Sequence, residues 1–278
     1  MSLLRKMLNT DDYFDNGLVR MLFKAFVYAE ARFICNYIPQ NSHEERLTGH
    51  LISEYLSALG VIQKAFQAKA CQIYKEHLSL EFSYVDLSSY NREKTTGADF
   101  GIMFHINLPD YPEEIRTAIF QAKKLFKASA SIDVKQCNVL KNYGEEGAHY
   151  CFYDMKTEAT SSPLVLPADC IALPSDPSQN TTTYSREALF DNREGGIPLS
   201  LFLIWYMFIS EDRKRCKVYK DIWQAKNYFD GGGSNSLNRE ANNPSRLLIV
   251  SIGGLTTSIP RQELKHLSQL YRFPSFEE

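Results

Sequence analysis

Three side chains that can carry chemistry stand at the ends of two apolar segments in the middle of the chain. Asp99 precedes FGIMFHI, while Gln121 and Lys123 lie in AIFQAKK. Side chains alternate along a strand, so Gln121 and Lys123 share one face. If 100–106 and 117–123 form an antiparallel hairpin around Tyr111, Asp99 is expected opposite Lys123 and diagonal to Gln121. A carboxylate, an amide and an ammonium group are therefore predicted to meet at one end of a hairpin.

These groups suit the hydrolysis of a phosphate ester. That reaction needs an activated water and positive charge against the developing negative charge. Mg²⁺ prefers oxygen ligands and needs only one or two carboxylates. A lysine beside such an ion can stabilise charge or handle a proton. The three residues are thus candidates for a metal-assisted site.

The elements that must position these residues follow from hydrophobic periodicity. Apolar residues recur in helical turns over 12–38, 43–60 and 61–77, with Gly60 separating the last two. The period then changes to two, which predicts strands at 78–87, 100–106 and 117–123. Helical spacing returns over 128–144, and AHYCFYDM at 148–155 reads as a fourth strand. From residue 42 the predicted order is helix, helix, three strands, helix and strand.

The remaining chain is less regular. Residues 160–185 are rich in Pro, Ser and Thr and predict a long surface excursion. IPLSLFLIWYMFIS at 197–210 is predicted to be a buried helix or strand, or a dimer interface. RLLIVSIGG at 246–254 predicts one more buried strand. We expect an N-terminal helical segment at 1–41, a core at 42–155 and a C-terminal α/β extension at 156–278, packed on the core or separate from it.

Composition sets broad limits. The chain has 278 residues, a net charge of -2 and 44% hydrophobic residues, as expected of a folded protein without bulk disorder. Six scattered cysteines lack CxxC spacing, which argues against a zinc knuckle. The N-terminus has no apolar core of signal-peptide length, and the longest apolar stretch, 197–210, is too short to span a membrane. We therefore expect a cytoplasmic protein with reduced thiols and no membrane partner.

The pattern of Asp99 followed by Gln121-x-Lys123 resembles the PD-(D/E)xK nuclease superfamily, in the variant with glutamine typical of Mrr-type restriction endonucleases. The resemblance covers about residues 42–155, and the element order also fits. It implies an α/β fold with a mixed central sheet flanked by helices and a restriction-endonuclease-like core. Ala98 replaces the usual proline, and Gln121 replaces the usual acid.

The resemblance also implies roles for individual residues. Asp99 and Gln121 would hold Mg²⁺, for which Mn²⁺ can substitute, and the Ala122 carbonyl is a further candidate. Lys123 would position the attacking water or stabilise charge. An acid on the first core helix would complete the site. Our choice is Glu45, with Glu44 and Glu54 as alternatives.

Residues around the motif are candidates for contacts with nucleic acid. Lys124 and Lys127 follow the motif and can bind the phosphate backbone. Gln136 lies on the helix expected to pack near the site and can touch a phosphate. The alternative for each of these three residues is an ordinary surface position without a role in binding.

The implied activity is Mg²⁺-dependent hydrolysis of DNA phosphodiester bonds, as an effector in restriction or anti-phage defence. The alternatives are a non-catalytic protein on the same fold that binds nucleic acid or a partner, and a structural subunit that docks through loops 174–186 and 230–245. A regulatory protein partner and a homo-oligomer are compatible with each of them.

Overall fold

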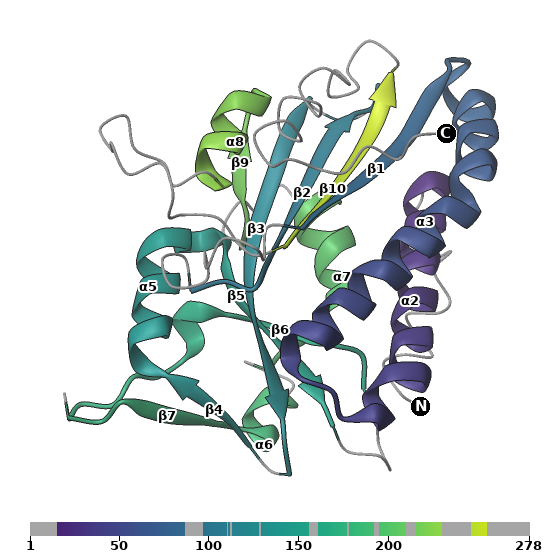
Figure 1. Cartoon of the computed structure of the whole chain (residues 1–278). Helices are drawn as coiled ribbons and strands as arrows, with labels where there is room; N and C mark the ends of the chain where they lie inside the picture. The colour runs from purple at the N-terminus through teal and green to yellow at the C-terminus, as the bar shows by residue number, and fades with distance from the viewer. Residues whose placement is uncertain are drawn as a thin grey trace.

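The computed structural model describes residues 16–86, 97–109, 111, 113–127, 129–155, 161–176, 178–191, 195–209, 215–229 and 246–254. Within these ranges a mixed sheet of eight strands runs through the molecule (Figure 1). Its strands, with the two of a small second sheet, are β1 (Leu78–Asp86), β2 (Phe100–Asn107), β3 (Glu114–Leu125), β4 (Ser129–Asp133), β5 (Ala148–Asp154), β6 (Leu164–Pro167), β7 (Thr181–Ser185), β8 (Ile197–Pro198), β9 (Lys217–Tyr219) and β10 (Arg246–Gly254).

The main sheet has the order β1-β10-β2-β3-β5-β6-β8, and β9 pairs with the first part of β3. The pairs β10–β2 and β3–β5 are parallel, and the other pairs are antiparallel. β4 and β7 form a separate antiparallel pair. The predicted α/β class with a mixed central sheet is confirmed.

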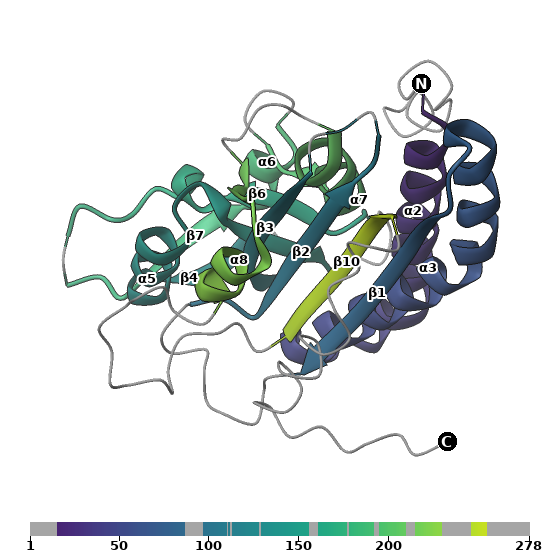
Figure 2. The ribbon, with the colours of Figure 1, turned by 90° about the horizontal axis from the view of Figure 1, so that it is seen from above.

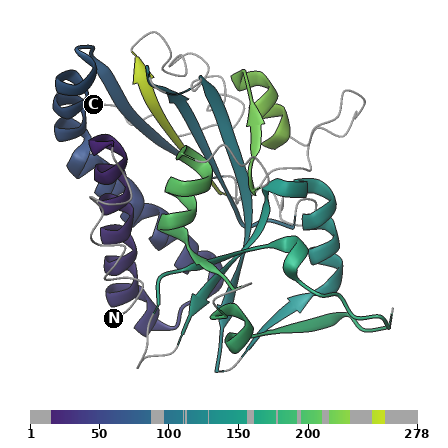
Figure 3. The same cartoon turned by 180° about the vertical axis from the view of Figure 1, so that it is seen from behind.

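Helices cover both faces of this sheet (Figures 2 and 3). On one face lie α2 (Gly17–Tyr37), α3 (Glu44–Tyr74) and α7 (Leu199–Ile204), which continues into a π-helical turn at Trp205–Ile209. On the other lie α5 (Val134–Gly144) and α8 (Ile222–Phe229). The shorter elements are α6 (Arg186–Leu189) and the 3₁₀ turns Ile38–Gln40, Glu145–Gly147 and Ala168–Cys170.

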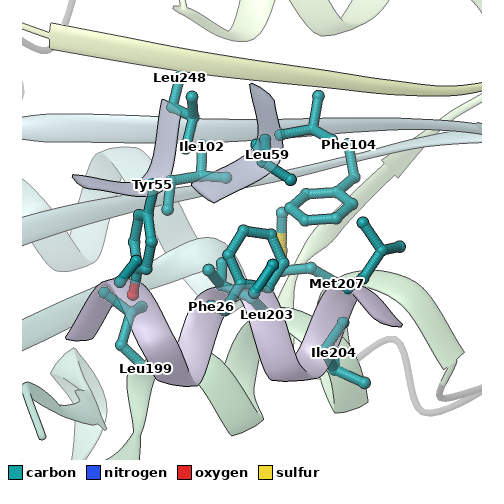
Figure 4. Packing of buried hydrophobic residues seen from close by; sticks show 14 of the residues in the cluster. Phe26, Tyr55, Leu59, Ile102, Phe104, Leu199, Leu203, Ile204, Met207 and Leu248 are labelled. Carbon is teal, nitrogen blue, oxygen red and sulfur yellow. The ribbon is translucent and has the colours of Figure 1, made fainter. Parts of the chain in front are cut away.

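Strand alternation divides the apolar side chains between two cores. Ile102 and Phe104 of β2 face the α2–α3–α7 side, where Phe26, Tyr55 and Leu203 pack against them (Figure 4). The neighbouring positions of β2 and β3, including Met103 and Ile119, face α5 and α8. A strand buried on both faces reads as a near-continuous apolar run, which matches the sequence of β2.

One helix replaces two predicted ones. The break expected at Gly60 is wrong, because α3 runs unbroken for 31 residues. A glycine inside a helix costs about 1 kcal/mol relative to alanine. Burial of Leu59, Phe66 and Ala70 on either side of Gly60 outweighs that cost. The buried apolar stripe thus stabilises one continuous helix through Gly60.

Two further local expectations are corrected. Residues 129–133 form β4 and not the first turn of a helix, because β7 offers a partner strand and Asp133 caps α5 from outside. The hairpin β2–β3 pairs Phe100 with Phe120, which moves the register by two residues from the one expected around Tyr111. Asp99 consequently stands opposite Gln121 and not Lys123.

The late segments join the sheet of the central region. β10 is the predicted buried strand, and it inserts between β1 and β2, parallel to β2. Residues 197–209, predicted as a buried helix or strand, form β8, α7 and the π-helical turn. The predicted surface excursion contains β6 and β7. The docking loop proposed at 230–245 lies outside the described residues.

Candidate active site at the end of hairpin β2–β3

The side chains of Asp99 and Gln121 meet where β2 begins. Gln121 Nε2 donates to Asp99 Oδ2 at 2.6 Å, and the backbone N–H of Ala122 donates to the same oxygen at 2.7 Å. Asp99 is 5% exposed and Gln121 is 2% exposed. The hairpin therefore holds a carboxylate and an amide in direct contact, largely shielded from water.

Lys123 lies two residues further along the same face of β3. Its Nζ donates to Gln136 Oε1 at 3.4 Å and lies 3.9 Å from Glu44 Oε2. The Lys123 side chain is 15% exposed, against 34% for Glu44. Its ammonium group thus lies between an amide and an acid, and the side chain as a whole is partly exposed.

Gln136 connects the two halves of this arrangement. Its Nε2 donates to Gln121 Oε1 at 2.8 Å, while its Oε1 accepts from Lys123. Asp133 fixes its backbone as the N-cap of α5, with Oδ1 accepting from the Gln136 N–H at 2.7 Å. The expected contact between Gln136 and a phosphate remains a prediction, but its amide is already engaged in positioning Gln121 and Lys123.

Gly97 sets the distance between the Asp99 loop and α5. Its φ is +66°, and a Cβ there would lie 2.7 Å from the carbonyl oxygen of Gln136. Both features require glycine, because a side chain would be strained and would meet backbone. This close approach brings the carboxylate-bearing loop and the helix of Gln136 together.

The acid that approaches the site is Glu44, one of the alternatives, and the structure does not bring Glu45 into it. Glu44 Oε1 accepts from the backbone N–H of Lys124 at 2.8 Å, while Oε2 faces Lys123. Glu45 is exposed on the first turn of α3. Glu54 is buried further along α3 and pairs with Arg32 at 2.8 Å. Successive helical residues point about 100° apart, so docking of α3 decides which one faces the sheet.

The two flanking lysines have different environments. Lys124 Nζ donates to Asn41 Oδ1 at 3.1 Å and to the Ser42 carbonyl at 3.3 Å, which ties β3 to the turn before α3. Lys127 is exposed at the tip of the β3–β4 hairpin, with a φ of +58°. Lys124 therefore supports the position of Glu44, and Lys127 is accessible to a ligand.

The candidate metal ligands of this site are oxygen atoms. Asp99 and the Ala122 carbonyl offer one carboxylate and one neutral oxygen, whereas Gln121 presents its nitrogen to both of them and its oxygen to Gln136. Mg²⁺ needs only one or two carboxylates and keeps several waters. No cluster of three or more His, Cys, Asp or Glu suited to a metal occurs among the described residues. Oxygen ligands are those that Mg²⁺ prefers, whereas Zn²⁺ favours closed nitrogen and sulfur ligand sets, and Gln121 would join such a set only with its amide turned around.

Comparison of the chain with protein-family models, curated proteins and solved structures finds no match. The function is therefore inferred from the geometry of the site. In the part of the chain that the structure describes, no helix has both the length and the apolar character needed to cross a bilayer.

Proposed function

We propose that the protein is a metal-dependent nuclease that hydrolyses DNA phosphodiester bonds with a restriction-endonuclease-like core. One observation carries the proposal. Asp99 and Gln121 touch at 2.6 Å, and the next residue on that face, Lys123, lies between Gln136 and Glu44. A buried carboxylate and amide, with a partly exposed lysine beside them, provide what hydrolysis of a phosphodiester needs.

Asp99, Gln121 and the Ala122 carbonyl would hold the Mg²⁺ ion. When bound, the ion polarises a phosphoryl oxygen and lowers the pKa of water. Lys123 Nζ supplies positive charge next to this position and can donate to a phosphate oxygen. Glu44 orients Lys123 through their 3.9 Å contact and can accept a proton from a water.

The side-chain amides of Gln121 and Gln136 can turn together. In the structure Gln121 presents its nitrogen to Asp99 and its oxygen to Gln136. A half-turn of the Gln121 amide would present its oxygen beside Asp99 and its nitrogen to Gln136. Gln136 would then turn as well, so that its oxygen accepts from Gln121. That turn removes the acceptor of Lys123 and frees its ammonium for substrate.

Cleavage of linear and supercoiled DNA with Mg²⁺, Mn²⁺ or EDTA tests the proposal. We expect cutting with either metal, none with EDTA, and loss of cutting in Lys123→Ala. Lys64→Ala is the matched control, because Lys64 is exposed on α3 far along the helix from Glu44. Cutting that survives Lys123→Ala would refute the site assignment.

A second candidate is a nucleic-acid-binding or partner-binding subunit without catalysis. It is favoured by the direct bonds from Gln121 and Ala122 to Asp99, which complete a strand end without a metal. For this candidate, Asp99→Ala would leave binding intact and no form of the protein would cut. A search for cleavage in the presence of co-purifying proteins separates it from a nuclease that a defence-system partner activates. Oligomeric state can be measured on the same samples.

A further inference from the structure

The β3–β4 hairpin extends the active-site strand into an exposed aromatic tip. Phe126 is 54% exposed, and it pairs with Ser129 through two backbone hydrogen bonds of 3.2 and 3.3 Å. Lys127 follows with a left-handed backbone, which a non-glycine residue adopts only at some cost in energy. The tight turn therefore holds an aromatic ring in water at a fixed place beyond Lys123.

A second exposed aromatic lies at the same end of the molecule. β5 pairs with β3 here, so Asp154 stands beside Leu125, and Arg186 Nη2 donates to Asp154 Oδ2 at 2.6 Å. Arg186 also covers the ring of Phe190, the residue that follows α6, at 4.6 Å from its centroid, and Phe190 is 41% exposed. α6 begins directly after Ser185, which pairs with Ser129 at the hairpin tip (Figure 1).

The tip segment itself carries positive charge, while Glu44 lies against its first two lysines. Residues 123–127 contain three lysines and no acid, and α6 contributes Arg186 and the exposed Glu187. The carboxylate of Asp154 is already paired with Arg186. Aromatic rings among lysine and arginine side chains are the combination that binds unpaired bases and the phosphates between them.

We propose that Phe126 stacks on an unpaired base of the substrate, so that the protein prefers DNA with a single-stranded segment next to the cut. This inference rests on the proposed nuclease function. Phe126 lies three residues beyond Lys123, or about 10 Å along the strand, and alternation turns its side chain to the other face of β3, so the bound DNA strand would pass around the end of the hairpin. One DNA strand advances 3.4 Å per nucleotide, so the stacked base lies about three or four nucleotides from the phosphate at Lys123.

The first test is binding in EDTA, where hydrolysis is blocked. A 20-base-pair duplex is compared with the same duplex carrying a three-nucleotide unpaired segment and with a single strand. We expect Phe126→Ala to weaken binding of the two unpaired substrates by about tenfold, because stacking on one base contributes that much or more. Binding of the full duplex should change less than threefold. Phe126→Trp should retain the preference.

Tyr28→Ala is the matched control. Tyr28 is 57% exposed on α2 and also has an arginine, Arg32, over its ring at 5.9 Å. Its removal should change no affinity. Because Phe126 is exposed, Phe126→Ala should fold, which its unfolding midpoint verifies.

The second test reports the base itself. 2-Aminopurine placed at each of the four nucleotides next to the cleavage site should change fluorescence at one position in the wild type and at none in Phe126→Ala. Equal affinities for paired and unpaired DNA, or no effect of Phe126→Ala, overturn the stacking inference while leaving the nuclease proposal intact. Absence of any DNA binding or cutting by the wild type would instead overturn the proposed function.

Discussion

Gln121 Nε2 donates a hydrogen bond of 2.6 Å to Asp99 Oδ2, across the start of the β2–β3 hairpin. The contact joins residues 22 positions apart in the sequence. Gln121 occupies the position where a second acid was expected, and its neutral amide donates a hydrogen bond to the first acid, Asp99. At this position no second carboxylate repels the charge on Asp99.

Gln121→Glu should lower the stability of the metal-free protein and raise its affinity for Mg²⁺. Two carboxylates in contact repel and raise the pKa of one of them. Loss of the hydrogen bond adds a cost, so we expect about 1–3 kcal/mol lower stability without metal. Mg²⁺ should restore stability more in this variant than in the wild type, as measured by thermal unfolding with EDTA or Mg²⁺. Gln224→Glu, at an exposed position on α8, is the control. An equal response to Mg²⁺ in both variants would argue against a metal at Asp99.

Glu44 and Glu45 form an internal pair of test and control on the first turn of α3. Glu44→Gln removes the charge that faces Lys123 at 3.9 Å, whereas Glu45→Gln changes an exposed residue. We expect cleavage to fall by about a hundredfold in Glu44→Gln, as for loss of a general base or an orienting charge, with no change in Glu45→Gln. DNA cleavage rates under single-turnover conditions measure both. The reverse ranking would restore Glu45 as the site acid.

Gln136→Ala should disconnect Lys123 from Gln121. The variant loses the donor to Gln121 Oε1 and the acceptor of Lys123 Nζ, while α5 keeps its Asp133 cap. We expect about tenfold slower cleavage with little change in DNA affinity, because positioning and not binding is lost. Asn138→Ala, at an exposed position of the same helix, should behave as wild type. A large loss of affinity in Gln136→Ala would instead indicate a direct phosphate contact.

Gly97→Ala should destabilise the fold near the site. The φ of +66° disfavours any side chain, and the new Cβ would meet the Gln136 carbonyl at 2.7 Å. We expect a loss of about 2 kcal/mol or more in the free energy of unfolding, measured by urea denaturation. Gly60→Ala is the control. The nearest atom to its new Cβ would be Phe82 Cζ at 3.7 Å, and alanine favours the helix, so stability should hold or rise.

Glu30 should make stability depend on pH. Burial raises the pKa of its carboxyl from 4.5 to about 7, although Tyr55 and Ser200 donate to it. The raised folded pKa means that the protonated form is favoured in the fold. Its contribution to stability is complete below pH 4.5 and is lost as pH rises through 7. The difference of about 2.5 pKa units corresponds to about 3 kcal/mol at pH 8.

Glu30→Gln removes this titration. Its amide oxygen can still accept from Tyr55 Oη and the Ser200 N–H, and its nitrogen can donate to Ser200 Oγ. The free energy of unfolding of Glu30→Gln should therefore rise relative to that of the wild type between pH 5 and pH 8. Urea denaturation at each pH measures the difference. His149, whose pKa burial lowers to about 3, contributes equally to both proteins and cancels. A constant difference across this range would contradict a raised pKa for Glu30.

The local pattern of the sequence determined much of the candidate site. Alternation along a strand placed Gln121 and Lys123 on one face, and the two apolar runs indicated the hairpin that brings Asp99 to them. The same periodicity identified the helices and most strands, because these depend on residues close in sequence. The roles of the site residues remain predictions.

Tertiary structure decided the rest, because those features depend on partners far apart in the chain. The insertion of β10 between β1 and β2 joins segments about 150 residues apart, which no local pattern specifies. The choice of Glu44 over Glu45 follows from how α3 docks on the sheet, and the register of Asp99 follows from the hairpin connection. The sequence determined which residues share a face, since this needs only the period of one strand. Packing between distant elements decided which of them meet.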